Sequence, residues 1–342
     1  MMGFLDYFTS DLAIDLGTAN TLIICNGNIV VDEPSIIAID RLTNKVIAIG
    51  SEAMQMHEKT HENIRTIRPL KDGVIADFHA AEHMIRGMIK MIDNNKKLFP
   101  VSHRMVICIP SGITEVEKRA VRDSAEHAGA KEVYMIQEPI AAAIGIGIEI
   151  EKPFGSMIID IGGGTTEIAI IALSGIVTDQ SIRTAGDSFT ADIIDYMKRQ
   201  HNLLIGERSA ETIKIEVGSA MTELKDAPED LDIRGRDLVT GIPKVVKISY
   251  SEIGFAMDKS ISKIEEAVLK ALENAPPELS ADIYDNGIYL TGGGALLRGL
   301  DKRLALKTKL QIHVAEDPLK AVVRGTGMAL RNIDSFKPVL MN

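Results

Sequence analysis

Cysteine is scarce in this sequence, with Cys25 and Cys108 the only two among 342 residues. Both lie in apolar runs that predict buried strands, where a free thiol packs as a small hydrophobic group more often than it forms a disulfide. Long apolar runs are missing as well, since none approaches the roughly 20 residues of a membrane-spanning helix. The N-terminus lacks the basic start and the small-residue cleavage site of a secretion signal. Together these absences predict a reducing, cytoplasmic location.

Positive charge is in deficit: 38 lysines and arginines stand against 48 aspartates and glutamates, which gives a formal net charge of −10. Such a chain repels nucleic-acid phosphates and anionic lipid heads, so we expect no nucleic-acid partner, and any membrane contact must rely on apolar insertion. The remaining composition, 45% hydrophobic and 25% charged, is typical of a globular protein. The length fits two or three ordinary domains, and two lobes are the first expectation.

Short β-rich runs follow one another closely between residues 12 and 49 and predict hairpins of a single sheet. From Phe78 onward strands and helices alternate, which predicts an α/β sheet with helices packed on its faces. Thr114 and Glu117 have the spacing of a capping box, and Gly129 stands where the helix that they begin should end. The pattern starts again at Met157, so the chain is predicted to repeat one plan, with residues 185–248 as an inserted smaller subdomain.

Three glycine-rich turns, each directly after an apolar strand, carry the chemical argument: residues 15–20 (DLGTAN), 160–166 (DIGGGTT) and 291–295 (TGGGA). Glycine lets backbone amides approach phosphate oxygens closely, and a run of exposed amides forms an anion-binding concavity. No Lys-Ser or Lys-Thr follows the glycines, and no turn has the G-x-G-x-x-G spacing before a helix. The pattern therefore excludes a Walker loop and a Rossmann fingerprint but favours phosphate as the guest.

An aspartate ends the strand before each of the first two turns, and these residues are Asp15 and Asp160. Carboxylates beside phosphates repel them unless a cation lies between, so the pair predicts Mg²⁺ held through water. A single glycine turn is usually no more than a turn. Three turns, two of them with the matching aspartate, are much harder to explain in that way.

Glu138 is a further candidate because it directly precedes Pro139, the predicted first residue of a helix. A carboxylate at that place can simply be a residue favoured by the helix dipole. Ala141, Ala142 and Ala143 follow, however, and such a face of small residues allows close approach by a neighbouring element. Glu138 is therefore predicted to orient a water molecule toward a terminal phosphate.

These motifs, in this order and spacing, resemble the phosphate, connecting and adenosine motifs of the actin and heat-shock chaperone superfamily. Within it, residues 12–21 (LAIDLGTANT), 68–78 (RPLKDGVIADF), 158–168 (IIDIGGGTTEI) and 202–206 (NLLIG) are similar to the MreB family of bacterial actin-like proteins. The resemblance covers essentially the whole chain. It implies a two-lobed actin-like (ribonuclease H-like) α/β ATPase fold with a duplicated βββαβα core and two inserted subdomains.

The resemblance also implies subdomain bounds: IA from 1–32, 66–144 and 319–342; IB from 33–65; IIA from 145–183 and 250–318; and IIB from 184–249. It assigns Glu138 and Asp160 to catalysis, with Thr166 near the attacking water. It assigns the first phosphate loop to Asp15, Gly17, Thr18, Ala19 and Asn20, and the second to Gly162, Gly163, Gly164 and Thr165. It places around the nucleoside the residues Glu211, Thr212, Ile213, Lys214, Gly292, Gly293, Gly294, Ala295 and Leu296.

The function that the resemblance implies is primarily structural: an ATP- and Mg²⁺-binding cytoskeletal protein that polymerises into membrane-associated filaments and organises cell-wall synthesis to maintain rod cell shape. Hydrolysis would be slow, and Asn20 stands where muscle-type actins carry a lysine. The partners implied are other copies of the chain, the inner face of the cell membrane, and the elongation proteins MreC, MreD and RodZ. The alternative is a small-molecule (sugar) kinase of the same superfamily, which needs an aspartate base beside a pocket for a substrate hydroxyl.

Two apolar segments are candidate membrane contacts. Met1, Phe4, Leu5 and Phe8 fall on one face of a helix, and Leu98 and Phe99 follow a polar loop, where apolar residues could form a wedge. The ordinary alternatives are a loose or packed terminus and the start of the next strand. Residues 57–61 match the zinc-protease pattern H-E-x-x-H, but their polar flanks favour a solvated helix end.

Overall fold

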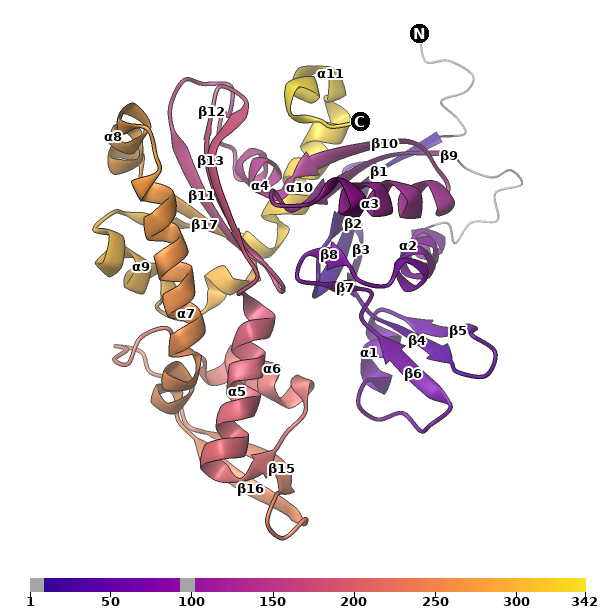
Figure 1. The fold of residues 1–342 in the computed structure, drawn as a ribbon, viewed down its shortest axis with the longest axis vertical. Helices are drawn as coiled ribbons and strands as arrows, with labels where there is room; N and C mark the ends of the chain where they lie inside the picture. The colour runs from indigo at the N-terminus through magenta and orange to yellow at the C-terminus, as the bar shows by residue number, and fades with distance from the viewer. Residues whose placement is uncertain (1–8, 93–101) are drawn as a thin grey trace. The chain divides into compact units, whose positions relative to one another are not determined.

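The computed structural model describes residues 9–92 and 102–342, and the chain divides into two compact units. Unit 1 comprises Met1–Phe154, Ile171–Val177 and Leu319–Asn342, within the described ranges, and unit 2 comprises Gly155–Ile170 and Thr178–Pro318. Figure 1 shows the course of the chain in each unit. Each unit has its own hydrophobic core around its own sheet.

The central sheet of unit 1 has five strands in the order β10-β9-β1-β2-β3 (Figure 1). The first three strands form two antiparallel hairpins, whereas β9 runs parallel to β1, and β10 runs parallel to β9. The strands are β1 (Thr9–Leu16), β2 (Asn20–Cys25), β3 (Asn28–Pro34), β9 (Ser102–Ile109) and β10 (Ala130–Gln137). A parallel connection needs a crossover, and helices supply it here.

Side-chain alternation along β1 divides the core of unit 1 between the two faces of this sheet. Leu12 and Ile14 share a hydrophobic cluster with Met84 and Met88 of α2, so α2 covers that face. Ala13 points to the opposite face, where α10 packs on β1 and β9. The helices of unit 1 are α1 (Ser51–Met56), α2 (Phe78–Ile92), α3 (Glu115–His127), α4 (Glu138–Gly145), α10 (Ala321–Arg331) and α11 (Ile333–Phe336), with the 3-10 turn η4 (Lys337–Val339).

The expectation of a single sheet between residues 12 and 49 is wrong. β4 (Ile37–Asp40) and β5 (Val46–Ile49) form a separate sheet with β6 (Ile64–Ile67), in the order β5-β4-β6. The chain leaves the first sheet after Pro34, which has no N–H group to donate to a neighbouring strand. The N–H of the next residue, Ser35, donates to the Ala19 carbonyl instead. A two-stranded ladder, β7 (Leu70–Lys71) with β8 (Val74–Ile75), leads back to α2.

Unit 2 repeats the plan with a five-stranded sheet in the order β13-β12-β11-β17-β18. Figure 1 labels β11, β12, β13 and β17 of this sheet. The strands are β11 (Ser156–Ile161), β12 (Thr166–Ala172), β13 (Gly175–Ile182), β17 (Ile288–Thr291) and β18 (Ile312–Val314). As in unit 1, the first strand in the sequence, β11, lies at the centre of the sheet. The next two strands, β12 and β13, lie on one side of it, and β17 and β18 pair in parallel on the other side. The predicted duplication of one α/β plan is therefore present.

A smaller antiparallel sheet, β14-β15-β16, is inserted in unit 2 between residues 203 and 248. Its strands are β14 (Leu203–Leu204), β15 (Leu231–Asp237) and β16 (Pro243–Ile248). The helices of unit 2 are α5 (Gly186–His201), α6 (Glu207–Val217), α7 (Tyr250–Glu273), α8 (Pro277–Asn286) and α9 (Leu300–Thr308), and η2 (Gly293–Leu296) and the 3-10 turn η3 (Pro318–Lys320) complete the list.

Local sequence signals set the ends of several helices. The predicted capping box of α3 is present, because Thr114 accepts from the Glu117 N–H while the Glu117 carboxylate accepts from the Thr114 N–H. α7 begins with the same device at Ser249 and Glu252. Even α7, with 24 residues, is too polar to cross a bilayer, and the same holds for every other helix in the described ranges.

Glycines let helices α4 and α10 touch backbone to backbone. A Cβ atom added to Gly325 would lie 1.7 Å from the Ala141 carbonyl oxygen, and one added to Gly145 would lie 1.9 Å from the Ala321 carbonyl oxygen. Non-bonded contacts of a Cβ atom below about 3 Å essentially never occur, and backbone cannot swing aside as a side chain can. The contact therefore fixes the position of α4 against α10 within unit 1.

We expect Gly325→Ala to destabilise the protein by about 1–3 kcal/mol or more, because the added methyl group forces α4 and α10 apart. The free energy of unfolding in urea, followed by circular dichroism, measures this. Gly327→Ala in the same helix is the matched control, since its Cβ would meet only the end of the Ile24 side chain at 3.1 Å. Equal losses in the two variants would contradict the proposed role of the helix contact.

Candidate functional site

The central strand of each sheet ends in an aspartate that precedes a glycine turn. In unit 1, β1 delivers Asp15, and the chain then turns through Gly17 into β2. A Cβ at Gly17 would lie 2.6 Å from the Asn20 carbonyl oxygen, so the turn excludes any side chain at this position. In unit 2, β11 delivers Asp160, and Gly162 to Thr165 close the turn with a hydrogen bond of 2.9 Å from the Gly162 N–H to the Thr165 carbonyl.

Two carbonyl oxygens of the first glycine turn accept hydrogen bonds from Ser35, which is completely buried. The Ser35 hydroxyl donates to the Gly17 carbonyl at 2.6 Å, and the Ser35 N–H donates to the Ala19 carbonyl at 2.9 Å. The Thr18 hydroxyl accepts from the Gly73 N–H at 2.9 Å. Because carbonyl oxygens repel anions, engaging them leaves a turn whose amide groups can face a phosphate.

Burial dominates the electrostatics of Asp15. It raises the pKa of this carboxyl group from 3.8 to about 6, against the smaller effect of a hydrogen bond from the Cys108 thiol, which lies 3.1 Å from Oδ1. The pKa of Cys108 is raised well above its usual value, first by burial and then by the charges of Asp15 and Glu138. The influence of both carboxylates on one thiol places Asp15, Cys108 and Glu138 close together in unit 1.

The two glycine turns of unit 2 are joined by a buried hydrogen bond. The Thr291 hydroxyl, at the end of β17, donates to the Asp160 carboxylate at 2.7 Å. Gly292 follows with a φ of 79°, and a Cβ there would lie 2.3 Å from the Ile161 carbonyl oxygen. Gly294 has Ile161 Cγ2 at 2.2 Å from its Cβ position. The glycine turn after β17 thus packs directly on the turn after β11, although the two are far apart in the sequence.

The N-terminus of α5 lies against the second glycine turn. The Gly186 and Asp187 N–H groups donate to the Gly162 and Gly163 carbonyls at 3.1 and 2.7 Å. As in unit 1, two carbonyl oxygens of the turn are thereby engaged. The partial positive charge of a helix N-terminus adds to the attraction that such a turn has for phosphate.

Lys214 and Glu211, one helical turn apart on α6, also reach this end of α5. The Lys214 ammonium donates to the Gly186 carbonyl at 3.0 Å and lies 2.7 Å from the Glu211 carboxylate. Thr190 completes the group, because its hydroxyl donates to Glu211 at 2.9 Å and accepts from Lys214 at 3.2 Å. Unit 2 therefore gathers a cation, a carboxylate and a hydroxyl beside the second glycine turn.

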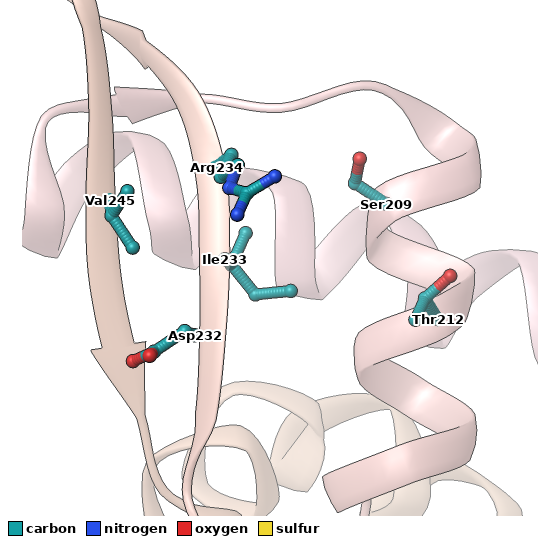
Figure 2. A pocket seen from close by; sticks show the side chains of 6 residues that line it. All are labelled: Ser209, Thr212, Asp232, Ile233, Arg234 and Val245. Atoms are coloured by element: carbon teal, nitrogen blue, oxygen red, sulfur yellow. The ribbon is translucent and has the colours of Figure 1, made fainter.

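Three of the predicted site residues do not contact the glycine turns through the hydrogen bonds described above. Thr166 is completely buried, and its hydroxyl donates to the Thr184 carbonyl at 2.7 Å. Ile213 is completely buried in the core of unit 2. Thr212 faces a separate concavity of about 490 Å³ between α6 and β15, shown in Figure 2 with the residues that line it: Ser209, Thr212, Asp232, Ile233, Arg234 and Val245. Of the four predicted residues on α6, Glu211 and Lys214 are thus the pair at the second turn.

The remaining predicted residues lie in or beside the turns themselves. Ala19 and the exposed Asn20 complete the first turn, and Gly164 and the buried Thr165 complete the second. In η2, Gly293 and Leu296 are exposed, whereas Ala295 is buried. The proposed membrane residues Met1, Phe4, Leu5, Phe8, Leu98 and Phe99 lie outside the described residues.

The zinc-protease pattern at residues 57–61 does not form one helical face. α1 ends at Met56, and Glu58 has a φ of 59°, so the backbone between His57 and His61 is not helical. His57 Nδ1 lies 2.8 Å from the Thr66 hydroxyl. Across residues 9–92 and 102–342, no three His, Cys, Asp or Glu side chains gather in a metal-binding group.

Sequence reasoning missed Ser35, Gly73, Gly186 and Thr190. Ser35 and Gly73 have no local signal, since their contacts to the first turn depend on how distant segments pack. Gly186 and Asp187 follow a strand and begin an amphipathic helix. A helix N-terminus at such a place favours anion binding, so the sequence did contain a signal for these two residues. Thr190 is one helical turn after Gly186, so the same signal could have identified it.

The residues present fit a hard cation such as Mg²⁺, which prefers carboxylate oxygen ligands. Asp15 is half-buried, and its raised pKa shows that the thiol hydrogen bond only partly compensates its desolvation. Asp160 is 5% exposed and accepts a hydrogen bond from a neutral hydroxyl. Each unit therefore offers one carboxylate, next to a phosphate-compatible turn, that a cation would stabilise.

Comparison with known proteins decides the family. The sequence matches the MreB/Mbl protein family over residues 9–338. The chain belongs to the MreB/Mbl family. It is 49% identical over 330 residues to the cell shape-determining protein Mbl of Bacillus subtilis, covering 96% of this chain and 98% of that protein. It is also 49% identical over 336 residues to the cell shape-determining protein MreB of Escherichia coli K12, with 97% and 96% covered.

A solved MreB structure confirms the predicted actin-like α/β fold. MreB5 of Spiroplasma citri bound to AMPPNP is 40% identical, has a TM-score of 0.89, and is matched over 96% of this chain and 97% of that chain. The same MreB protein was also solved bound to ADP and matches with a TM-score of 0.88.

We expect Asp15→Asn to stabilise the nucleotide-free protein. The folded-state pKa of about 6 exceeds the ordinary 3.8, so between these values the folded state binds more protons than the unfolded state, and stability falls as pH rises through the window. Above about pH 6 the charged group costs up to about 3 kcal/mol, at 1.36 kcal/mol per pKa unit, and asparagine avoids this cost.

Urea unfolding of both proteins across the pH range measures this effect. The gain should be largest above about pH 6 and should disappear toward about pH 3, which lies below both pKa values, so that aspartate is protonated in both states. Asp32→Asn is the matched control, because Asp32 is an exposed residue of β3, and its replacement should change stability by less than about 0.5 kcal/mol. A pH-independent gain in Asp15→Asn would contradict the explanation.

Proposed function

We propose that this chain binds ATP with Mg²⁺ at its glycine turns and polymerises into filaments that help to determine cell shape. The observation that carries the proposal is the same construction in both units. An aspartate with little or no exposure ends the central strand, and a glycine turn follows in which two carbonyl oxygens accept hydrogen bonds from neighbouring elements. Supporting it, similar solved structures hold AMPPNP and ADP, and the relatives in two bacteria are named as cell shape-determining proteins.

The proposed binding roles follow from the chemistry of each group. The amides of residues 17–20 and 163–165 hold phosphate oxygens, with the N-terminus of α5 adding positive potential. Glu211, Lys214 and Thr190 bind the ribose hydroxyls, because together they offer both donors and acceptors, and the turn at residues 292–296 supports the base. Asp15 and Asp160 would hold Mg²⁺ through water, and the bound ion would supply positive charge that neutralises the phosphates.

Hydrolysis is proposed to be slow and electrostatic. Glu138, the first residue of α4, orients a water molecule toward the terminal phosphate, and backbone amides of the glycine turns stabilise the charge that develops there. No covalent intermediate is needed. Asn20 supplies no positive charge at the first turn, so the amide groups carry more of the stabilisation. The Thr166 hydroxyl, which donates to Thr184, supports the turn next to this water rather than reacting itself.

The finer cellular role is also part of the proposal. Filaments at the inner face of the cell membrane would organise cell-wall synthesis through elongation proteins such as MreC, MreD and RodZ. Each apolar anchor binds weakly by itself, because burying a large side chain gains about 1.5–3 kcal/mol at most. A filament carries many anchors, so polymerisation and membrane attachment should strengthen each other.

The test of the proposal adds Mg-ATP to the pure protein and follows light scattering and pelleting, with calorimetry for binding. We expect heat of binding and a pelletable polymer with Mg-ATP, and much less of both without nucleotide. GTP in the same assay tests base preference. Absence of binding heat would reject the nucleotide site, and phosphate transfer to a sugar without polymer would favour the kinase alternative.

We expect Glu138→Ala to bind ATP almost normally but to release phosphate at least about tenfold more slowly, because a group that orients the nucleophile acts mainly on the chemical step. Phosphate release after ATP addition, measured with calorimetric affinity, separates the two effects. Glu149→Ala is the matched control, since Glu149 is an exposed carboxylate in the same unit. An unchanged release rate in Glu138→Ala would refute its role.

Liposome sedimentation tests the membrane contact. Removing residues 1–10 together with Leu98→Ser and Phe99→Ser should abolish pelleting with lipid, because the apolar side chains that would insert are lost. ATP-dependent pelleting without lipid should persist and serves as the control for assembly. If the variant still pellets with lipid as the parent does, the anchor lies elsewhere.

A further inference from the structure

A second concavity lies in unit 1, on the three-stranded sheet β5-β4-β6. Figure 1 labels the three strands of this sheet. Its volume is about 400 Å³, and the residues that line it are Ile39, Arg41, Asn44 and Arg65. Ile39 and Arg65 are directly paired across β4 and β6, and Arg41 is two residues beyond Ile39. Side chains two apart on a strand, and those of paired residues, share a face of the sheet. The two arginines therefore converge on the same side.

That side is opposite the face that packs on α1. Ala38 and Ile64, the neighbours of Ile39 and Arg65, belong to a small hydrophobic cluster with Ala53 of α1. On the other face, Ile37 at the start of β4 is buried in the main core of unit 1. The arginines lie at the opposite end of that face. The concavity is therefore the open end of a sheet face whose inner end is closed by apolar packing.

The loop that carries Arg41 and Asn44 is held in one shape before any ligand arrives. The Asp40 carboxylate accepts from the Leu42 and Thr43 N–H groups at 2.9 and 2.8 Å and from the Thr43 hydroxyl at 3.0 Å. The Arg41 N–H donates to the Asn63 carbonyl at 2.9 Å. These hydrogen bonds fix the backbone of the loop, so binding does not have to order that backbone.

The same hydrogen bonds leave the arginines without an acidic partner. Asp40 is the carboxylate nearest to Arg41 in sequence, but it serves its own turn, and no carboxylate of the described residues forms an ion pair with Arg41 or Arg65. This is notable in a chain with ten more acidic than basic residues. A pair of arginines, with an amide at Asn44, presents mainly donors, so the complementary ligand is an anion.

The shape and lining favour a carboxylate on a hydrocarbon stem. The planar guanidinium group of arginine matches a carboxylate through two parallel hydrogen bonds. Ile39 adds an apolar contact for methylene groups, which inorganic phosphate cannot use. The net charge of −10 disfavours the dense phosphate arrays of nucleic acid and lipid surfaces.

We propose that this concavity is a docking site for glutamate or aspartate side chains of an acidic polypeptide segment on a protein partner. Arg41 and Arg65 bind the carboxylate, Asn44 contributes a further hydrogen bond, and Ile39 packs against the stem. The site belongs to the β5-β4-β6 sheet alone and does not depend on nucleotide binding.

The test measures fluorescence anisotropy of a labelled hexaglutamate peptide with the full-length protein at low salt. Hexaglutamine serves as the neutral peptide. We expect hexaglutamate to bind, hexaglutamine not to bind, and Arg41→Gln and Arg65→Gln each to weaken binding about tenfold or more, the effect of losing one charge-assisted hydrogen-bonded contact. Unchanged circular dichroism melting would show that the variants remain folded.

Lys59→Gln is the matched control, because it removes one exposed positive charge from the same region without touching the concavity. Its affinity should stay within about twofold of the parent, as expected for a screened surface charge. A loss in Lys59→Gln equal to that in Arg65→Gln would overturn the proposal in favour of general charge attraction. Displacement of the peptide by inorganic phosphate but not by glutarate would overturn the assignment to carboxylates.

Discussion

Burial of a carboxylate at the end of a central strand is the constraint on which both halves of this protein depend. Asp15 and Asp160 occupy equivalent places in two sheets of the same strand order. Desolvation of a charge is costly, and folded proteins usually compensate it with a basic partner. The donors here include a thiol at Asp15 and a threonine hydroxyl at Asp160, both of them neutral. A neutral donor satisfies a carboxylate oxygen without cancelling its negative charge.

The second common feature is the treatment of backbone oxygens. Ser35 engages two carbonyl groups in one turn, and the first residues of α5 engage two in the other. Different elements thus solve the same electrostatic problem, which is to keep oxygen dipoles from facing an anion. Glycine is needed because a Cβ would strike backbone at Gly17 and at Gly292. The glycines of the turn are therefore necessary but not sufficient. The neighbouring elements that hydrogen-bond its carbonyl oxygens are needed as well.

Patterns local in sequence were predicted well, whereas contacts between distant segments were not. The glycine turns, the repeat of one plan and the capping box of α3 all rest on neighbouring residues, and they were visible in the sequence. Ser35 and Gly73 act through hydrogen bonds to segments far along the chain, so no spacing rule reveals them. The single-sheet expectation failed for the same reason, since pairing of β4 with β6 skips a helix and depends on tertiary packing. Ile213 shows the limit of transferring a short motif whole, because adjacent helical residues point in different directions.

The contact of α4 with α10 determines how accurately Glu138 can be held. Glu138 begins α4, and that helix meets α10 through main-chain atoms at Gly145 and Gly325 rather than through interlocking side chains. Main-chain atoms have no rotamers, so warming the protein opens no alternative packing at this seam. The helix that carries Glu138 is thus held by main-chain contacts. The position of Glu138 should therefore depend less on temperature than that of a residue held by flexible side chains.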